Sequence, residues 1–274
     1  MPYIPRTAAT RMAPWLAPMI ALLGLALAAT SGLAQGSGKG WEVAARSDRT
    51  DLGFGDSRVA LEMVLTNAAG ESTTRELEIT TLEKESEEVG DRSLVLFETP
   101  RDIEGTALLS HAKILDPDDQ WLYLPALKRV KRISSSNKSG PFVGSEFAFE
   151  DITSQELNKY RYEYLREEPC GEFTCDVVQR FPLYEGSGYT RQVGWYDQTH
   201  YQIRKVEYYD RKDSLLKTQT FEGYRQYGDI WRAQRFVMRN HQTGKGTDLV
   251  FGEYRFGVGL DEGDFVKGVL NRLN

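Results

Sequence analysis

The sequence predicts a mainly β protein whose folded part is one domain of about 11–12 antiparallel strands. Apolar and polar residues alternate with period two along most of the chain from Ser57 onward, which is typical of half-buried strands. Short turn signals rich in glycine, aspartate and asparagine separate the strands, which favours an antiparallel up-and-down order. No linker interrupts the segment from Trp41 to Leu273, so we expect a single sandwich or curved barrel.

The first 34 residues have the features of a secretory signal peptide. Arg6 and Arg11 form its positive region, residues 15–30 are apolar, and residues 32–34 (GLA) provide small residues for cleavage after Ala34. The apolar stretch is short for a membrane span, although an uncleaved anchor is the alternative. The mature chain is therefore expected outside the cytoplasm.

Residues 35–40 are predicted as a flexible leader and residues 41–274 as the folded domain. The domain is expected to open with a short helix at 41–50, with Trp41 and Val43 on its apolar side. The strands predicted after it cover residues 57–66, 73–82, 94–97, 106–115, 121–133 with an interruption at Pro125, 160–164, 177–181, 189–195, 203–209, 216–221, 231–238 and 249–256.

Two regions depart from the strand pattern. Residues 142–158 mix glutamates with apolar residues and are expected to form short helices over the sheet. The chain should end in a helix at 261–273, because Asp261 is a suitable N-cap with Asp264 three residues later. Its predicted apolar face consists of Phe265, Val266, Val269, Leu270 and Leu273.

Some strands are apolar on both faces, notably residues 94–97 and 121–124. A sheet with water on one side does not need that pattern. Either ordinary packing covers both faces, or one face meets a lid while the other lines an apolar interior. A barrel of more than eight strands leaves such a cavity unless something fills it.

The two cysteines, Cys170 and Cys175, are expected to form a disulfide, as an even cysteine count in an exported chain suggests. Four intervening residues suit the two ends of a hairpin turn. A redox-active pair is the alternative, although such pairs usually have two intervening residues.

Nothing in the sequence indicates catalysis, a metal site or a cofactor. The three histidines are isolated, and Ser110 and His111 should lie on opposite faces of one strand. Ser187 lies between glycines but lacks the spacing of a nucleophile elbow. Residues 116–119 (DPDD) begin like a calcium loop but lack its later glycine and glutamate, so a turn is expected. The net charge of −6 argues against general nucleic-acid binding.

A basic cluster stands out in this acidic chain. It consists of Lys128, Arg129, Lys131, Arg132 and Lys138. One interpretation is an edge strand kept soluble by charge. The other is a docking surface for an anionic partner, either a lipid headgroup or an acidic protein, because each cation contributes about 1 kcal/mol at an anionic membrane.

A run of apolar residues follows this cluster, with Phe142, Val143, Phe147 and Phe149 close together. These residues are either part of an ordinary core or a mobile gate for an acyl chain. By strand parity, Leu122, Leu124 and Trp195 are further candidates for lining a lipid cavity.

The runs WLYLPALKRVKRISSS (121–136) and GSEFAFEDI (144–152) resemble the LolA-like outer-membrane lipoprotein-sorting proteins of the LolA/LolB/LppX superfamily. GFGDS (53–57), RDIEGTALL (101–109), EYYDRKD (207–213) and the hairpin of Cys170 and Cys175 add to the resemblance. It spans nearly the whole chain from Trp41 to about Phe265.

The resemblance implies an incompletely closed β-barrel with a few covering helices, an apolar cavity for acyl chains and no catalytic residues. It also implies a periplasmic carrier of lipoprotein acyl chains or a phospholipid-like lipid. The carrier would contact the membrane transiently and work with an inner-membrane partner, either a lipoprotein-release complex or an RND-type transporter. The alternative is a non-catalytic accessory protein of such a transporter. A lipid hydrolase is a third possibility for which the sequence offers no nucleophile.

Overall fold

The computed structural model describes residues 38–84, 86 and 89–273. The predicted signal peptide and its cleavage site after Ala34 lie outside these residues. Residues 35–37 of the predicted leader also lie outside them, and its last two residues already belong to a helix, α1 (Lys39–Arg49). No helix within the described ranges combines the length and hydropathy needed to cross a membrane.

Strands dominate the rest of the described chain. They are β1 (Asp56–Thr66), β2 (Ser72–Leu82), β3 (Val89–Thr99), β4 (Ala107–Lys113), β5 (Asp119–Leu124), β6 (Arg129–Ile133), β7 (Tyr160–Cys170), β8 (Phe173–Pro182), β9 (Tyr189–Asp197), β10 (Ile203–Asp210), β11 (Leu215–Glu222), β12 (Arg225–Tyr227), β13 (Ile230–Arg232), β14 (Arg235–Asn240), β15 (Gly246–Phe251) and β16 (Arg255–Phe256).

The strand number exceeds the predicted 11–12 because three predicted strands are divided and β12 was not predicted. The segment predicted at 121–133 forms β5 and β6, which are separated at the predicted interruption. The segment predicted at 231–238 splits into β13, which pairs with the unpredicted β12 in a small separate sheet, and β14, which pairs with β11. The segment predicted at 249–256 breaks at Gly252, whose N–H donates to Ala60 O (2.8 Å). A side chain at Gly252 would come within 3.1 Å of that carbonyl oxygen, so glycine permits the close approach.

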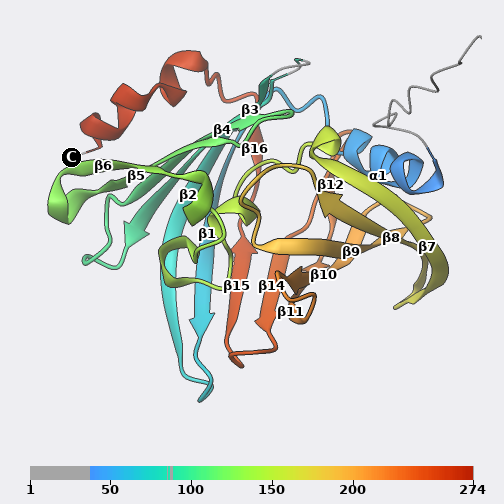
Figure 1. The fold of residues 1–274 in the computed structure, drawn as a ribbon. Helices are drawn as coiled ribbons and strands as arrows, with labels where there is room; N and C mark the ends of the chain where they lie inside the picture. Colours follow the sequence, from blue (N-terminus) through green and yellow to red (C-terminus); the bar gives the residue numbers. More distant parts are fainter. Residues whose placement is uncertain (1–37, 85, 87–88, 274) are drawn as a thin grey trace, which may run out of the picture. The chain divides into compact units, whose positions relative to one another are not determined.

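Fourteen strands form one antiparallel sheet that is not closed, which confirms the predicted fold class. The order is β6-β5-β4-β3-β2-β1-β15-β14-β11-β10-β9-β8-β7, and β16 pairs with β1. The chain thus forms two up-and-down halves that are joined where β1 pairs with β15 (Figure 1). The two ends of the sheet, β6 and β7, are linked by residues 134–159, which we call the central segment.

The central segment contains short 3₁₀ turns, three of which begin within residues 142–158, where the sequence predicted short helices. They are η2 (Ser135–Asn137), η3 (Phe142–Gly144), η4 (Phe149–Asp151) and η5 (Leu157–Lys159). A further turn, η1 (Pro125–Leu127), separates β5 from β6.

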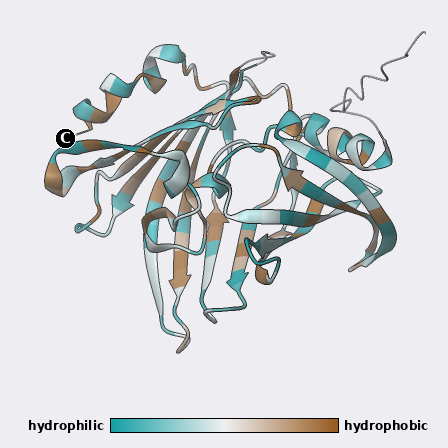
Figure 2. Cartoon of the chain, in the orientation of Figure 1, coloured by the Kyte–Doolittle hydropathy of each residue, from teal (hydrophilic) through white to brown (hydrophobic). Residues whose placement is uncertain are grey.

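Both faces of the N-terminal half of the sheet are covered by ordinary packing. On the face that we call inner, Val95, Phe97 and Leu108 pack against Phe142 and Phe147 of the central segment. On the outer face, the other side chains of β3–β5 pack against the C-terminal segment. The strands whose sequences are apolar on both faces, β3 and β5, are therefore covered on both faces. Figure 2 shows hydrophobic and hydrophilic bands along the sheet.

The C-terminal segment departs from the predicted single helix. It forms two 3₁₀ segments, η6 (Glu262–Phe265) and η7 (Lys267–Arg272). Asp261 is the N-cap, as predicted, and its carboxylate accepts from Gly263 N (2.7 Å). The backbone is extended at Val266, which separates the two segments. Val266 is exposed and Val269 half-buried, whereas Phe265 and Leu270 are fully buried.

Candidate functional site

A cavity of about 420 Å³ lies on the inner face of the C-terminal half of the sheet. Helix α1 forms one wall of it, because Val43 of α1 packs against Val178 and Tyr196 of the sheet. The last residues of the central segment, around Leu157, form another wall. Figure 1 shows α1 beside β7 and β8 at this end of the sheet.

The cavity lining has polar and apolar parts, whereas the predicted cavity was apolar throughout. The apolar lining includes Ile203, Val206, Phe221 and Phe236 of strands β10, β11 and β14. The polar lining on the sheet consists of Tyr162, Arg180, Tyr196, Tyr208 and Gln219. Antiparallel pairing brings these residues together, because Arg180 lies opposite Tyr162 on one side and Gln192 on the other.

Hydrogen bonds fix the orientation of most of this polar lining. Tyr208 Oη donates to Gln219 Oε1 (2.6 Å), and Tyr162 Oη donates to the carbonyl of Leu157 (3.0 Å). Arg180 Nε donates to Gln192 Oε1 (2.8 Å). The polar wall is therefore preorganised rather than loosely packed.

Five carboxylates line the cavity, those of Asp48, Asp51, Asp91, Asp151 and Glu156. Asp51 is paired with Arg232 and Asp151 with Lys217, whereas Asp48 of α1, Asp91 of β3 and Glu156 of the central segment form no ion pair with a described residue. Burial raises the pKa of Asp48 and of Asp91 above the ordinary range. Burial, with the nearby charge of Asp91 in second place, raises the pKa of Glu156 to about 7. This part of the lining therefore changes its charge near neutral pH.

The predicted gate residues lie in the core rather than along this cavity. Phe142, Phe147 and Phe149 are buried in the inner-face cluster, with Val143 and Leu122 packed partly against it. Leu124 is half-buried at the end of β5. None of these side chains lines the 420 Å³ cavity.

Buried polar contacts hold the central segment in place. The Asp151 carboxylate accepts from Lys217 Nζ of β11 (2.6 Å), and both side chains are at most 5% exposed. Lys159 forms a second buried ion pair with Asp118. Glu150 accepts from Tyr184 Oη (2.9 Å). These contacts favour a fixed plug over a mobile gate for this segment.

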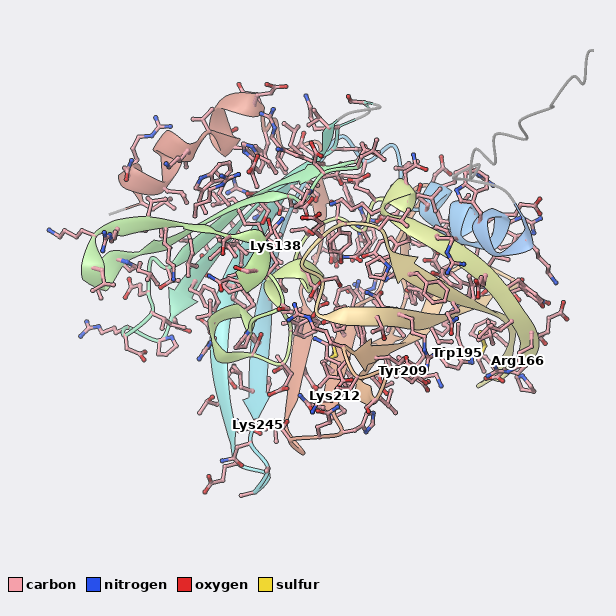
Figure 3. All side chains as sticks on the ribbon, in the orientation of Figure 1. Lys138, Arg166, Trp195, Tyr209, Lys212 and Lys245 are labelled. Atoms are coloured by element: carbon pink, nitrogen blue, oxygen red, sulfur yellow. A yellow bond between two sulfur atoms is a disulfide. The ribbon has the colours of Figure 1, made fainter. Side chains whose placement is uncertain are left out.

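The predicted basic cluster divides into exposed and buried members. Lys128, Arg129 and Lys131 are exposed around the start of the edge strand β6 and make no ion pair within the described part of the chain. Arg132 is exposed and pairs with Asp119. Lys138 is instead 3% exposed, donates to the carbonyl of Asp118 and is drawn among the central ribbons in Figure 3. Burial lowers the pKa of Lys138.

A second hollow of about 480 Å³ lies between the central segment and the β10–β11 turn. Phe147, Ala148 and Leu216 line it together with the charged residues Arg211 and Lys212. It is more open to solvent than the first cavity, which we therefore take as the candidate binding site.

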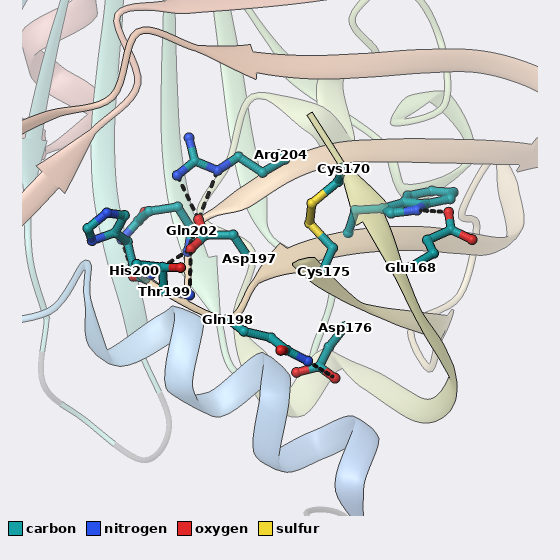
Figure 4. Close-up of a disulfide and its surroundings, with 11 residues drawn as sticks. Glu168, Cys170, Cys175, Asp176, Asp197, Gln198, Thr199, His200, Gln202 and Arg204 are labelled. Atoms are coloured by element: carbon teal, nitrogen blue, oxygen red, sulfur yellow. Dashed lines mark hydrogen bonds and ion pairs between the residues drawn. A yellow bond between two sulfur atoms is a disulfide. The ribbon is translucent and has the colours of Figure 1, made fainter. Parts of the chain in front are cut away.

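Cys170 and Cys175 form a disulfide across the β7–β8 hairpin, with their Cα atoms 5.8 Å apart (Figure 4). Trp195 packs beside this disulfide on the outer face of the sheet, together with Tyr209. Figure 3 shows Trp195 and Tyr209 close together, away from the central segment. The disulfide is thus a hairpin staple, and Trp195 lies on the face opposite the cavity.

The residues considered for chemistry have structural contacts. Ser110 Oγ accepts from Gln120 Nε2 (3.3 Å), whereas His111 Nε2 donates to the carbonyl of Phe265 (2.7 Å) on the other face of the strand. This confirms their predicted opposite orientation. Over residues 38–84, 86 and 89–273, no three His, Cys, Asp or Glu side chains are grouped in a way that could hold a metal ion.

Sequence reasoning missed the polar wall of the cavity, and Arg180 above all. Val177 and Val178 are both apolar, so strand parity does not reveal which face of β8 is the inner one. The alternation of Tyr160, Tyr162 and Tyr164 was the available signal. A row of tyrosines on one strand face suits a partly wet interior better than a dry core.

Two solved structures are similar to this chain in both sequence and fold. It is 52% identical to a solved structure from Vibrio parahaemolyticus described as an outer membrane lipoprotein-sorting protein domain. That match has a TM-score of 0.82 and covers 85% of this chain and 99% of that one. A DUF1329 family protein from Desulfovibrio piger is 28% identical, with a TM-score of 0.79 over 84% of this chain and 96% of that one.

A LolA superfamily protein from Nitrosomonas europaea shares the fold. It is 18% identical, and the match has a TM-score of 0.69 and covers 85% of this chain and all of that one. A family profile described as "Uncharacterized protein" matches residues 90–272. No curated protein matches the chain.

Proposed function

We infer that this chain, which belongs to the LolA-like family of outer-membrane lipoprotein-sorting proteins, is a periplasmic carrier. It would shield the acyl chains of a lipoprotein or lipid during transport between the inner and outer membranes. The observation that carries this proposal is the cavity of about 420 Å³ with an apolar wall formed by Ile203, Val206, Phe221 and Phe236.

The energetics explain why a carrier needs such a cavity. Exposing an acyl chain to water costs about 0.8 kcal/mol per CH₂ group, so a sixteen-carbon chain costs on the order of 12 kcal/mol. The cavity volume lies in the range of about 300–1,000 Å³ that is typical of small-molecule sites. It therefore suits one chain better than several.

A periplasmic location is supported by the predicted signal peptide and by the disulfide between Cys170 and Cys175. Disulfides persist in the bacterial periplasm and are rare in the cytosol.

A larger cargo would require the central segment to move. The gate role predicted for Phe142, Val143, Phe147 and Phe149 would open the apolar inner face of the N-terminal half to the cavity. The main resistance to this motion would come from the buried pair of Asp151 and Lys217.

Native mass spectrometry of the mature chain, purified gently from periplasm, tests the carrier proposal. We expect a bound lipid or acylated species at close to one per chain, identified by lipid extraction of the same sample. A chain that arrives empty and takes up no added lipid contradicts the proposal.

A second candidate function is docking to an inner-membrane transporter or to the membrane surface. The observation that favours it is the group of exposed cations Lys128, Arg129 and Lys131 beside Leu127, which is 66% exposed. An apolar residue among cations at a hairpin tip is typical of interfacial contact.

Charge reversal of Lys128, Arg129, Lys131 and Arg132 to glutamate tests this second function. We expect the variant to lose binding to vesicles containing phosphatidylglycerol or to membranes that contain the transporter. Reversal of the exposed Lys245 is the control. Lost transporter binding with lipid uptake intact favours the accessory role, and unchanged binding to both membranes contradicts docking through this surface.

A further inference from the structure

Arg180 is a buried cation without a carboxylate partner. Its side chain extends from β8 into the cavity, and the residue is only 9% exposed. Its one hydrogen bond within the described residues runs from Nε to Gln192 Oε1 (2.8 Å), and its guanidinium carbon lies 4.5 Å from the centroid of the Tyr160 ring. No aspartate or glutamate of the described chain forms an ion pair with it.

Two other buried cations of the inner face form ion pairs with carboxylates. Lys159 is paired with Asp118, and Lys217 is paired with Asp151. A buried charge is strongly disfavoured unless an opposite charge and hydrogen bonds compensate it. Lys138 is also buried without an ion pair to a described residue, but its Nζ donates to the carbonyl of Asp118 and it does not line the cavity. Arg180 does line the cavity, and the side of its guanidinium that faces the cavity offers N–H donors to a ligand.

A second donor lies beside Arg180. Tyr196, which is 6% exposed and lines the same cavity, makes no hydrogen bond through its hydroxyl within the described residues. Its ring lies across Gly194, where an added Cβ would approach to 2.9 Å. The absence of a side chain at Gly194 therefore allows Tyr196 to lie close to the sheet next to the guanidinium.

The apolar wall begins where this donor pair ends. Val206 lies opposite Gly194 in the pairing of β9 with β10, and Gln219 lies opposite Val206 in the next strand. Phe221 and Phe236 continue the wall away from Arg180 and lie opposite each other in β11 and β14. Arg180 thus places an unpaired cation at one end of an apolar wall. The second guanidinium that lines the cavity, that of Arg232, is paired with Asp51.

We propose that Arg180 and Tyr196 bind the acid group of a single-chain amphiphile, a carboxylate or a phosphate, whose hydrocarbon chain lies along Val206, Phe221 and Phe236. The proposal rests on the carrier function proposed above and specifies the class of cargo. A guanidinium binds either acid group through charge-assisted, often bidentate hydrogen bonds, and the tyrosine hydroxyl adds a third donor. A cavity of about 420 Å³ favours one chain over a multiply acylated protein anchor.

Isothermal titration of the delipidated mature chain tests the proposal with three probes of equal chain length. Palmitate carries a carboxylate, palmitoyl lysophosphatidic acid carries a phosphate, and monopalmitoylglycerol is the neutral control, all used below their aggregation thresholds. We expect either acid to bind at least tenfold more tightly than the neutral probe. The stronger of the two acids identifies the acid group.

Variants then assign the effect to the donors. Arg180→Met should weaken binding of the acid at least twentyfold and change binding of the neutral probe less than threefold. Arg180→Lys should restore part of the affinity, and Tyr196→Phe should weaken acid binding several-fold while keeping the ring. Arg161→Met, on the exposed face of β7, removes the same charge outside the cavity and should leave all three affinities unchanged.

Thermal unfolding of the same variants separates ligand binding from a structural role. If Arg180 serves to bind a ligand, its unpaired buried charge does not stabilise the ligand-free fold. We therefore expect Arg180→Met to be at least as stable as the wild type in the absence of ligand. If Arg180→Met does not fold, Arg180 is structural and the proposal is overturned. Equal binding of acid and neutral probes to the wild type overturns the proposal but leaves the carrier function standing. Failure of the wild type to bind any probe contradicts both.

Discussion

The buried pair of Asp151 and Lys217 should hold the central segment in place, and a double-mutant cycle measures its contribution. Asp151 lies in η4 of the central segment and Lys217 in β11, with the two charged groups 2.6 Å apart. The carboxylate also accepts from Ala148 N (2.7 Å) and from Tyr189 Oη (2.9 Å). The pair therefore fixes the central segment to β11, which lies in the middle of the C-terminal half of the sheet.

The expected magnitudes follow from burial. Both side chains are at most 5% exposed, so either single change leaves an uncompensated buried charge, which costs about 3–5 kcal/mol. We expect Asp151→Asn and Lys217→Met each to lower the free energy of unfolding by about 3 kcal/mol. The double variant should lose much less than the sum, because no unpaired charge is left, which corresponds to a coupling energy of about 2–3 kcal/mol.

Urea unfolding of the mature chain at pH 7, followed by tryptophan fluorescence and circular dichroism, provides the free energies. Glu253→Gln is the matched control, because Glu253 is 68% exposed in its pair with Arg225, and it should change stability by less than about 0.5 kcal/mol. Trypsin should also cleave the central segment of the single variants faster. Single variants within about 0.5 kcal/mol of the wild type, or additive effects in the double variant, would refute the idea that this pair fixes the segment.

Three further predictions concern other parts of the fold. Burial and the nearby Asp91 raise the pKa of Glu156 to about 7, so the neutral carboxyl stabilises the fold at low pH, and this contribution is lost as the pH rises through 7. The free energy of unfolding of Glu156→Gln, measured in urea, should equal that of the wild type at pH 4 and exceed it by about 2 kcal/mol at pH 8. A difference between the two proteins that does not depend on pH contradicts this prediction. Replacing Cys170 and Cys175 by alanine should lower the free energy of unfolding by about 2 kcal/mol, because the disulfide closes only a short loop. A variant whose thermal midpoint equals that of the oxidised wild type would show that the disulfide does not stabilise the hairpin. Phe265→Ala should cost about 3–5 kcal/mol because its side chain is fully buried, and a loss below about 1 kcal/mol in the same urea assay would mean that the C-terminal segment does not dock as described.

Much of the fold follows from local patterns in the sequence. Alternation along residues 57–66 reports directly which side chains of β1 are buried, since Val59, Leu61 and Met63 are all at most 5% exposed. The cap at Asp261 is equally local, because a carboxylate and the backbone N–H two residues later determine it. Such features need no knowledge of distant residues.

The site depends on partners that are distant in sequence. Lys138 belongs by sequence to the basic cluster, yet the carbonyl of Asp118 and the surrounding segment bury it. From the sequence alone, Phe142 fits a gate or the core equally well. Its ring contact with Phe97 in the structure places it in the core. The unpaired state of Arg180 is visible only when all neighbouring strands are in place.

The pairing of β1 with β15 has a consequence for how the chain reaches its native state. Leu61 lies opposite Phe251, so the seam between the two halves joins the first strand of the sheet to nearly the last. In the export that we propose, the chain enters the next compartment from its N-terminus, so β1–β6 would emerge first with the apolar inner face of this half uncovered. Because β1 and β15 are far apart in the sequence, they pair slowly during folding. Until they pair, the N-terminal half of the sheet is prone to aggregation. We therefore expect truncation before β15 to leave an aggregation-prone intermediate, and periplasmic chaperones to matter most for the N-terminal half.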